Sequence, residues 1–149
     1  MAAADAQLSA RPGIYALALY LDQHQQLRIG ALGDFLFPAG YYLYVGSAWG
    51  PGGLRARVGR HLGGGSIQHW HIDYLRAVAE PCALWVAPEA ADECAWAMQL
   101  LALPEARIVA PRFGASDCDC PAHLVLLEKD PLNASLLLQA QYLQLRLPG

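Results

Sequence analysis

Apolar residues along the chain occur in short runs separated by turn-forming residues, a pattern typical of strands joined by tight turns. Two runs rich in aromatic and branched side chains, 13–20 and 41–45, predict core strands. Between them, the short stretches 27–29 and 34–37 lie on either side of a glycine-containing segment and predict a small hairpin. The sequence therefore predicts two core strands with a hairpin inserted between them.

Three helices are expected after the second core strand. In the first, Leu54, Val58 and Leu62 recur every four residues, the spacing of an amphipathic helix, and the glycines at 63–65 end it. Two more are expected over 69–79 and 88–103, the latter with Pro88 in its first turn. Their apolar faces are expected to consist of Trp70, Tyr74 and Ala77 in the former, and of Ala91, Cys94, Ala95, Met98 and Leu101 in the latter.

The remaining segments add two buried strands, expected over 81–87 and 123–128. Residues 111–121 carry no periodicity and predict an irregular loop, whereas the tail 132–147 fits a helix or a strand equally well. These elements together predict an α/β (α+β) fold, with a small and mainly antiparallel sheet flanked by helices. With 149 residues, the chain has the length of about one domain.

Composition excludes several classes of protein. Apolar residues make up 55% of the chain and charged residues 15%, which excludes a disordered chain. The formal net charge of −3 excludes a globally basic nucleic-acid binder but leaves room for a local basic patch. Nine of the ten cationic residues are arginines, with Lys129 the only lysine, and arginine matches the geometry of phosphate better than lysine does.

The location of the protein is predicted from what the sequence lacks. It has no apolar stretch of the roughly 18–20 residues that cross a bilayer, and no apolar core of a signal peptide near its start. Four cysteines, unevenly spread, do not form the framework of a disulfide-rich secreted domain. We therefore expect a cytoplasmic protein with reduced thiols and no membrane partner.

The residues that carry candidate chemistry begin with two tripeptides on the predicted core strands. Gly13-Ile14-Tyr15 lies on the first, and Tyr44-Val45-Gly46 ends the second. A glycine-rich turn (46–53) follows, and then the first predicted helix, which carries Arg57 and His61. Because these two residues are four apart, they share one helical face. Glu93 follows on a later predicted helix.

This ordered pattern resembles the GIY-YIG nuclease family, here with YVG as the second tripeptide. HWHIDYL (69–75) and CDCPAHL (118–124) are similar to segments of its small stand-alone Uri-type endonucleases. The resemblance implies a family core over about 11–103, followed by an extension over 104–149. It implies hydrolysis of phosphodiester bonds in DNA with Mg²⁺ or Mn²⁺, and a catalytic set of Tyr15, Tyr44, Arg57, His61 and Glu93, with Glu93 as the metal ligand.

The chemistry of these side chains suits that reaction. Arg57 is a permanent cation whose planar donors match a phosphate. A lone carboxylate such as Glu93 suits Mg²⁺, which keeps most of its own waters. Tyr15 is expected to accept a proton if a cation favours its phenolate, with His61 as the alternative acceptor or as a phosphate ligand.

Plainer interpretations remain open for each of these residues. Tyrosines on strands are usually half-buried core residues, and Arg57 could be a solvated cation on a helix face. Glu93 could merely favour a helix N-terminus, since Glu89 and Asp92 lie equally close to it. It is the order of the whole pattern that favours the functional interpretation.

The sequence also departs from the family pattern at two points. Twenty-eight residues separate Tyr15 from Tyr44, more than is usual, so the predicted hairpin has to allow the two strands to pair. The asparagine that often follows the glutamate is missing: the chain's only one is Asn133. Its candidate replacements are Gln99, Arg112 and Asp117.

A nucleic-acid surface is expected beside the catalytic set. Backbone amides at the start of the helix after Gly53 could hold an anion, and Trp49 could stack on a base or anchor its loop. His69 and Asp73, four residues apart, extend the expected surface. The candidate DNA contacts are Gly46, Ser47, Arg55, Arg60 and His69.

A second constellation lies near the end of the predicted loop, where Cys118-x-Cys120-x-x-His123 could hold zinc. The fourth ligand would have to come from Cys82, Cys94 or a distant histidine, and buried thiols without metal are the alternative. The sequence therefore leaves three hypotheses: a metal-dependent DNA endonuclease, a non-catalytic nucleic-acid-binding or accessory domain that keeps the same fold, and a zinc-stabilised interaction module.

Overall fold

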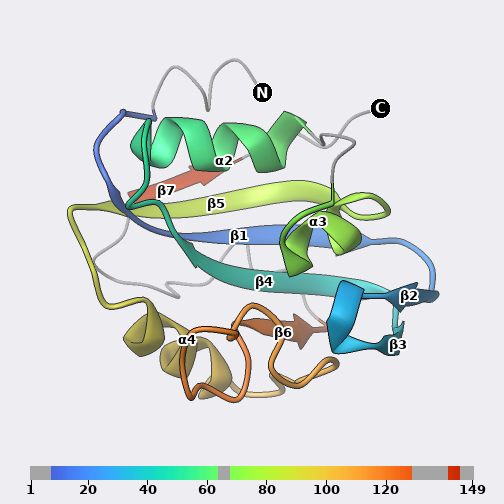
Figure 1. Cartoon of the computed structure of the whole chain (residues 1–149). Helices are drawn as coiled ribbons and strands as arrows, with labels where there is room; N and C mark the ends of the chain where they lie inside the picture. Colours follow the sequence, from blue (N-terminus) through green and yellow to red (C-terminus); the bar gives the residue numbers. More distant parts are fainter. Residues whose placement is uncertain (1–7, 64–67, 129–140, 145–149) are drawn as a thin grey trace.

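A computed structural model describes residues 8–63, 68–128 and 141–144 of the chain. Its main feature is a five-stranded antiparallel sheet in the order β6-β4-β1-β5-β7, and a separate two-stranded sheet joins β2 to β3 (Figure 1). This confirms the expected α+β class with a mainly antiparallel sheet. The strands are β1 (Gly13–Leu21), β2 (Gln25–Arg28), β3 (Asp34–Phe37), β4 (Gly40–Ser47), β5 (Glu80–Pro88), β6 (Leu124–Leu127) and β7 (Gln141–Gln144).

The inserted hairpin lets the two core strands pair, as the sequence analysis requires. β2 and β3 form the hairpin, with one turn of 3-10 helix (Gly30–Leu32) between them. On either side of it, β1 and β4 pair directly along their whole length, with Tyr15 opposite Gly46 and Leu17 opposite Tyr44. Since side chains alternate between the two faces of a sheet, both tyrosines lie on the same face.

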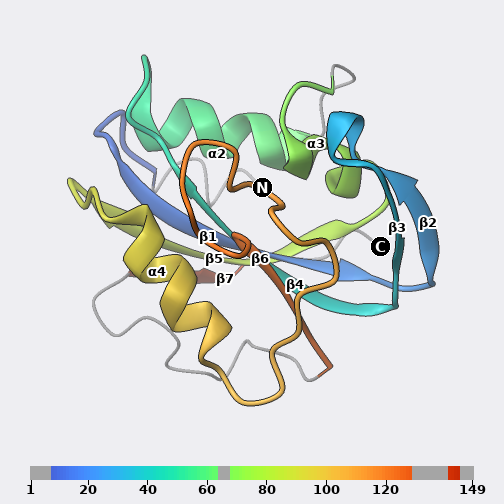
Figure 2. The ribbon, with the colours of Figure 1, turned by 60° about the horizontal axis from the view of Figure 1, so that its bottom comes forward.

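That face is covered by α2 (Gly53–Gly63) and α3 (His71–Arg76), whereas α4 (Glu93–Leu101) covers the other, so the sheet lies between α2 and α4 (Figure 2). The predicted stripe of α2 is confirmed, because Leu54, Val58 and Leu62 are buried against the sheet. Arg76 of α3 then donates to the backbone oxygens of His61 and Leu62, which satisfies carbonyls at the end of α2.

The apolar faces predicted for the other two helices are confirmed only in part. Trp70, Tyr74, Cys94 and Leu101 are partly buried against the hydrophobic cores, whereas Ala77, Ala91 and Met98 are exposed. In α3, which is shorter than the expected 69–79, the buried residues are Ile72 and Leu75. In α4 they are Ala97 and Leu100, while Met98 is 52% exposed. The buried face of α4 differs from the prediction because the helix starts later than expected. Pro88 ends β5 opposite Gly13 instead of opening the helix, so the helix begins five residues later and its register against the sheet changes.

The segment expected as an extension contributes to the same sheet. After α4, an irregular segment leads to β6, which pairs with β4 at one edge, and β7 pairs with β5 at the other. β7 is the described part of the tail 132–147. Ser66, Asn133 and the rest of that tail lie outside the described residues. Among the described helices, none has the length and apolar character needed to cross a membrane.

Candidate active site

The five residues of the expected catalytic set come together at one end of the main sheet. This end of the sheet holds the starts of β1 and β6 and the ends of β4 and β5. The antiparallel register shows this, because Gly13 of β1 lies opposite Pro88 of β5, and Ile14 lies opposite Ser47 of β4. Tyr15 and Tyr44 lie on these strands, Arg57 and His61 come from α2, and Glu93 opens α4. The charges of Arg57 and Glu93 both act on the hydroxyls of the two tyrosines. The structure therefore brings the set together from four elements.

The two tripeptides contain glycine because the backbone at their ends is closely approached. A Cβ at Gly46 would lie 2.3 Å from the hydroxyl oxygen of Tyr15, so only glycine leaves room for that ring. A Cβ at Gly13 would lie 2.5 Å from the backbone oxygen of Ala87 on the neighbouring strand. Both contacts are far inside normal packing distance, so Gly46 serves to place Tyr15 rather than to contact DNA directly.

Tyr15 is fully buried, and its hydroxyl lies 2.6 Å from Nε2 of His61. Burial, and next the neighbouring Tyr44, raise the pKa of Tyr15 well above its usual range, although Arg57 opposes the change. Burial and then the Glu93 carboxylate raise the pKa of Tyr44. The nearby cation expected to favour a phenolate is present, but burial outweighs it. Both tyrosines therefore carry their protons at neutral pH.

His61 is 2% exposed and lies behind Tyr15, so the expectation that it could bind a phosphate directly is wrong. Burial lowers the pKa of His61 from 6.5 to about 4, with the cations Arg57, Arg60 and Arg76 adding to the change and Asp73 opposing it. The ring is thus neutral and shares a hydrogen bond with the hydroxyl of Tyr15, in which Nε2 is the acceptor when the ring proton lies on Nδ1.

Lowering the pH is expected to destabilise the fold through His61. Above pH 6.5 the ring is neutral in the folded and unfolded chain alike, whereas between pH 6.5 and about 4 only the unfolded chain takes up the proton. The free energy of unfolding should therefore fall by about 3 kcal/mol across this window. Urea unfolding of the wild type and of His61→Gln at several pH values measures it. Equal pH dependence in the two proteins would contradict the buried neutral ring.

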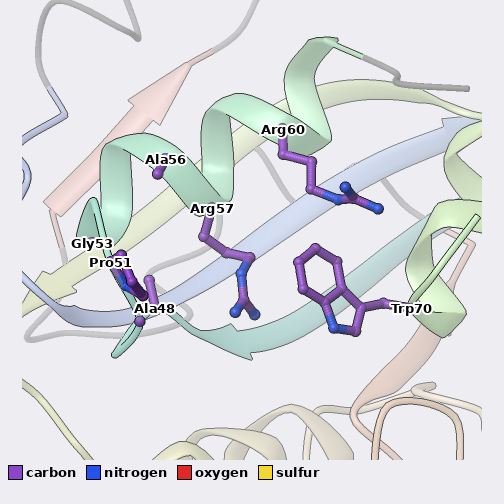
Figure 3. Close-up of a pocket in the computed structure, with 8 residues that line it drawn as sticks. Ala48, Pro51, Gly53, Ala56, Arg57, Arg60 and Trp70 are labelled. Carbon is purple, nitrogen blue, oxygen red and sulfur yellow. The ribbon is translucent and has the colours of Figure 1, made fainter. Parts of the chain in front are cut away.

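Arg57 and Trp70 line a hollow of about 190 Å³ between the glycine-rich turn, α2 and the segment before α3 (Figure 3). The Arg57 guanidinium lies 4.2 Å from the centre of the Trp70 ring, and its Nη1 donates to the backbone oxygen of Ser47 at 3.1 Å. No carboxylate in the described part of the chain forms an ion pair with Arg57. It therefore presents an uncompensated positive charge, held in place by an aromatic face.

A second arginine lines the same hollow. The guanidinium of Arg60 lies 4.4 Å from the centre of the Trp70 ring and pairs with Asp73 at 2.8 Å. The same carboxylate oxygen accepts the backbone N–H groups of His69 and Trp70. Asp73 was expected to extend the nucleic-acid surface. In the structure it links the backbone of Trp70 to the side chain of Arg60. Trp70 was expected only as part of an apolar helix face, so this role was not predicted from the sequence.

The expected anion site at the start of α2 is wrong. Backbone oxygens of Arg11 and Ser9 accept the N–H groups of Leu54 and Arg55, each at 2.9 Å. Nε and Nη2 of Arg55 donate to the backbone oxygen of Leu8, and Arg55 does not line the hollow. The basic cluster expected on α2 is therefore divided, and the positive charge of the hollow comes from side chains further along the helix.

The neighbouring carboxylates of Glu89, Asp92 and Glu93 have different partners in the structure. Glu89 pairs with Arg11 at 2.9 Å, and Asp92 caps α4 by accepting the N–H of Ala95. Of the three, only Glu93 lies close enough for its charge to raise the pKa of Tyr15 and Tyr44, and its side chain is 26% exposed. Its Oε2 lies 2.7 Å from Nδ1 of His123. Water can therefore reach the glutamate, as a metal ligand requires.

Next to Glu93 lies a group of thiols and one imidazole, here named the thiol–imidazole cluster. One potential ligand atom from each of its four residues lies within 4.8 Å of all the others. Sγ of Cys118 lies 3.3 Å from Nε2 of His123. Cys82 is elsewhere, buried in β5 with its thiol directed to the backbone oxygen of Ala18. The members of the cluster are Cys94, Cys118, Cys120 and His123.

The remaining expected residues lie at the margin of the site. Ser47 contributes its backbone oxygen to Arg57, and the exposed His69 packs its ring against Trp70. Trp49 is 52% exposed, but its indole N–H donates to the backbone oxygen of Ala90, so it anchors its loop. Arg112 does not replace the missing asparagine, because its guanidinium is bound to backbone oxygens of the loop, whereas Gln99 and Asp117 are exposed.

Comparison with known proteins gives one match. A family model described as "Domain of unknown function DUF123" matches residues 14–143, a span that includes every residue of the site and both edges of the sheet. No curated protein and no solved structure matches the chain.

Proposed function

The chain belongs to the DUF123 family, and from its site we propose that it is a metal-dependent endonuclease of GIY-YIG type, which hydrolyses phosphodiester bonds in DNA. The observation that carries the proposal is the convergence of Tyr15, Tyr44, Arg57 and Glu93 at one end of the sheet. Phosphodiester hydrolysis needs charge neutralisation, a proton acceptor and activation of water. These residues supply chemistry suited to each of the three requirements.

Arg57 neutralises charge on the phosphoryl oxygens. It enters the hollow already held by Ser47 and Trp70, so little conformational freedom is lost when a phosphate binds. A cation that is fixed before the reaction stabilises the charge that develops in the transition state. Because Arg57 has no carboxylate partner among the described residues, no ion pair has to break first.

The proton leaves the attacking water through Tyr15 and His61. A free phenolate is disfavoured in so buried a position, so Tyr15 passes its own proton to Nε2 of His61 as it accepts the proton of water. A phosphodiester bound at Arg57 brings negative charge towards His61 and raises its pKa, which favours this transfer. Tyr44, whose hydroxyl interacts with that of Tyr15, orients the acceptor.

Glu93 is the residue that would hold a divalent metal ion. Its carboxylate is partly exposed, and His123 is its only ion-pair partner among the described residues. One carboxylate suits Mg²⁺ or Mn²⁺, since Mg²⁺ in particular keeps several of its own waters. A bound divalent ion would lower the pKa of water and would supply Lewis acidity to stabilise the negative charge on the oxygen that leaves when the phosphorus–oxygen bond breaks.

The surface of the hollow favours single-stranded or structured DNA. The hollow is small, at about 190 Å³, and its two arginines are stacked on Trp70 instead of reaching outwards as a long basic track. Trp49 lies in the chain between Ala48 and Gly50, which line the hollow, and its exposed ring offers a stacking platform for an unpaired base. With a net charge of −3, the chain is suited to local phosphate capture and not to tight binding of long duplexes.

Incubation of the purified protein with labelled single-stranded, flapped and duplex DNA tests this proposal. We expect cleavage that requires Mg²⁺ or Mn²⁺. Glu93→Gln should raise the metal concentration for half-maximal cleavage by at least about 10-fold, since even an outer-shell metal partner contributes 10- to 100-fold in affinity. Glu89→Gln, which alters only the surface pair with Arg11, is the matched control. The proposal fails if no DNA substrate is cut with either metal.

One observation favours a second candidate function, the non-catalytic nucleic-acid-binding domain. Tyr15 is fully buried with a strongly raised pKa, which suits a structural hydroxyl as well as a relay. In that case the protein would shift DNA in a gel at low salt and never cut it, and Arg57→Ala would abolish the shift. Cleavage in the assay above excludes this alternative.

A further inference from the structure

Part of the irregular segment between α4 and β6 packs into the main core through Phe113 and Ala110, but the part that carries the cysteines does not. There the buried cluster consists of three small residues, Ala97 of α4 with Ala115 and Cys120, and Cys94 and Cys118 pack against them. Such a core buries little apolar area, and burial is the main source of stability in a packed domain. A segment of this kind needs another source of order.

The thiol–imidazole cluster lies where that order is needed. It joins the first turn of α4, through Cys94, to the loop residues Cys118 and Cys120 and to the residue that precedes β6. Arg112 arranges the loop, because its guanidinium donates to the backbone oxygens of Cys118 and Cys120. A single ion bound by all four side chains would connect three segments of the chain.

We propose that the thiol–imidazole cluster binds one zinc ion, and that the bound ion holds the His123 ring against the carboxylate of Glu93. Three thiolates and one imidazole are a donor set of structural zinc sites, which are four-coordinate and closed. Around tetrahedral zinc, with Zn–S distances of 2.3 Å, neighbouring ligand atoms lie about 3.8 Å apart. The four donor atoms, all within 4.8 Å of one another, already lie close to this arrangement. Thiolates also favour zinc over Mg²⁺ or Mn²⁺, so the two metal sites select different ions.

The second half of the proposal follows from the two nitrogens of His123. Nε2 lies beside Cys118 in the cluster, so coordination through Nε2 leaves the ring proton on Nδ1. Nδ1 lies 2.7 Å from Oε2 of Glu93. A carboxylate behind a zinc-bound histidine fixes the orientation of the ring and makes it a better ligand. The ion therefore positions Glu93, and Glu93 in turn strengthens the binding of the ion.

This arrangement assigns His123 as a positioning residue for Glu93. The zinc site stands on the geometry of the cluster alone, whereas its importance for cleavage rests on the proposed function. Glu93 and Cys94 are neighbours at the start of α4, so one helix turn carries both the proposed Mg²⁺ ligand and a zinc ligand.

Metal analysis of the reduced full-length protein tests the zinc site without any DNA. We expect about one zinc ion per chain and, after exchange with Co²⁺, a thiolate-to-cobalt charge-transfer band with the visible absorption of a tetrahedral site. Cys120→Ser should lose both signals. Cys82→Ser, whose thiol lies outside the cluster, is the matched control and should keep them. The zinc site is refuted if the wild type holds no zinc and takes up none when the reduced protein is given the ion.

The link to Glu93 is tested by measuring zinc affinity in competition with a chelator. Glu93→Gln should weaken zinc binding by about 10- to 100-fold, the usual effect of losing a carboxylate behind a ligating histidine. His123→Cys keeps four donors but has no Nδ1, so Glu93→Gln should have no effect in that background. Equal zinc affinity in wild type and Glu93→Gln would overturn the link. Because no nuclease assay is involved, failure of the endonuclease proposal does not affect either result.

Discussion

Replacement of Arg57 by alanine is expected to lower the rate of DNA cleavage by about 1,000-fold, the effect typical of a fixed arginine that stabilises phosphoryl charge. The guanidinium is held by the Ser47 backbone oxygen and the Trp70 ring, and no described carboxylate neutralises it. In the proposed reaction, its charge would therefore act fully on the transition state. Single-turnover cleavage rates at saturating DNA measure this loss, which should appear mainly in kcat and less in KM.

Two further variants separate the role of Arg57 from a general effect of positive charge. Arg57→Lys keeps the charge but loses the planar pair of donors, so its rate should fall between those of the wild type and Arg57→Ala. Arg28→Ala removes a cation from the exposed β2–β3 hairpin, where the side chain is 76% exposed, and should cleave as the wild type does. A wild-type rate in Arg57→Ala would contradict its assignment to the site.

Replacement of Tyr15 by phenylalanine is the second change with a large expected effect, a loss of about 100-fold or more in the cleavage rate. The substitution keeps the ring in the core and removes only the hydroxyl that bonds to Nε2 of His61. The proton then has no path from water to the imidazole. The pH dependence of the residual rate should also change, because His61 no longer takes part in the reaction.

Tyr42→Phe is the matched control for this experiment. Tyr42 is also fully buried, and its hydroxyl donates to the backbone oxygen of Pro38, away from the catalytic set. Each variant leaves one polar atom, Nε2 of His61 or the backbone oxygen of Pro38, without its hydrogen-bond partner, so each should lose about 1–3 kcal/mol of unfolding free energy. Only Tyr15→Phe should lose activity. If the two variants cleave equally well, the hydroxyl of Tyr15 has a structural role only.

Much of the fold was predictable because it depends on local pattern. The β-prone runs around Tyr15 and Tyr44 became neighbouring strands, and the β2–β3 hairpin accounts for the long segment between them. The four-residue spacing from Leu54 to Leu62 predicted α2 correctly. In each case the side chains nearby in sequence decide the structure, since they set both the period of the element and its buried face.

The predictions that were wrong concern choices made between distant segments. Pro88 suits the first turn of a helix, but pairing with Gly13 across the sheet keeps it in β5. As a result α4 begins at Glu93, with Asp92 as its cap, and its fully buried residues, Ala97 and Leu100, are not among those predicted. Carbonyls from Ser9 and Arg11 likewise occupy the amides of α2 that were expected to hold an anion.

By itself, the sequence determined the order of the strands and helices, the inserted hairpin and the residue types of a possible site. Only the tertiary structure decided that Glu93, and neither Glu89 nor Asp92, lies close enough for its charge to act on the tyrosines, that Trp70 holds two arginines, and that Cys94 completes the thiol–imidazole cluster. The physical reason is the range of the interactions. Periodicity along the chain reports which side chains favour burial, whereas the partner of each charged or polar group depends on residues that only folding brings within a few ångströms.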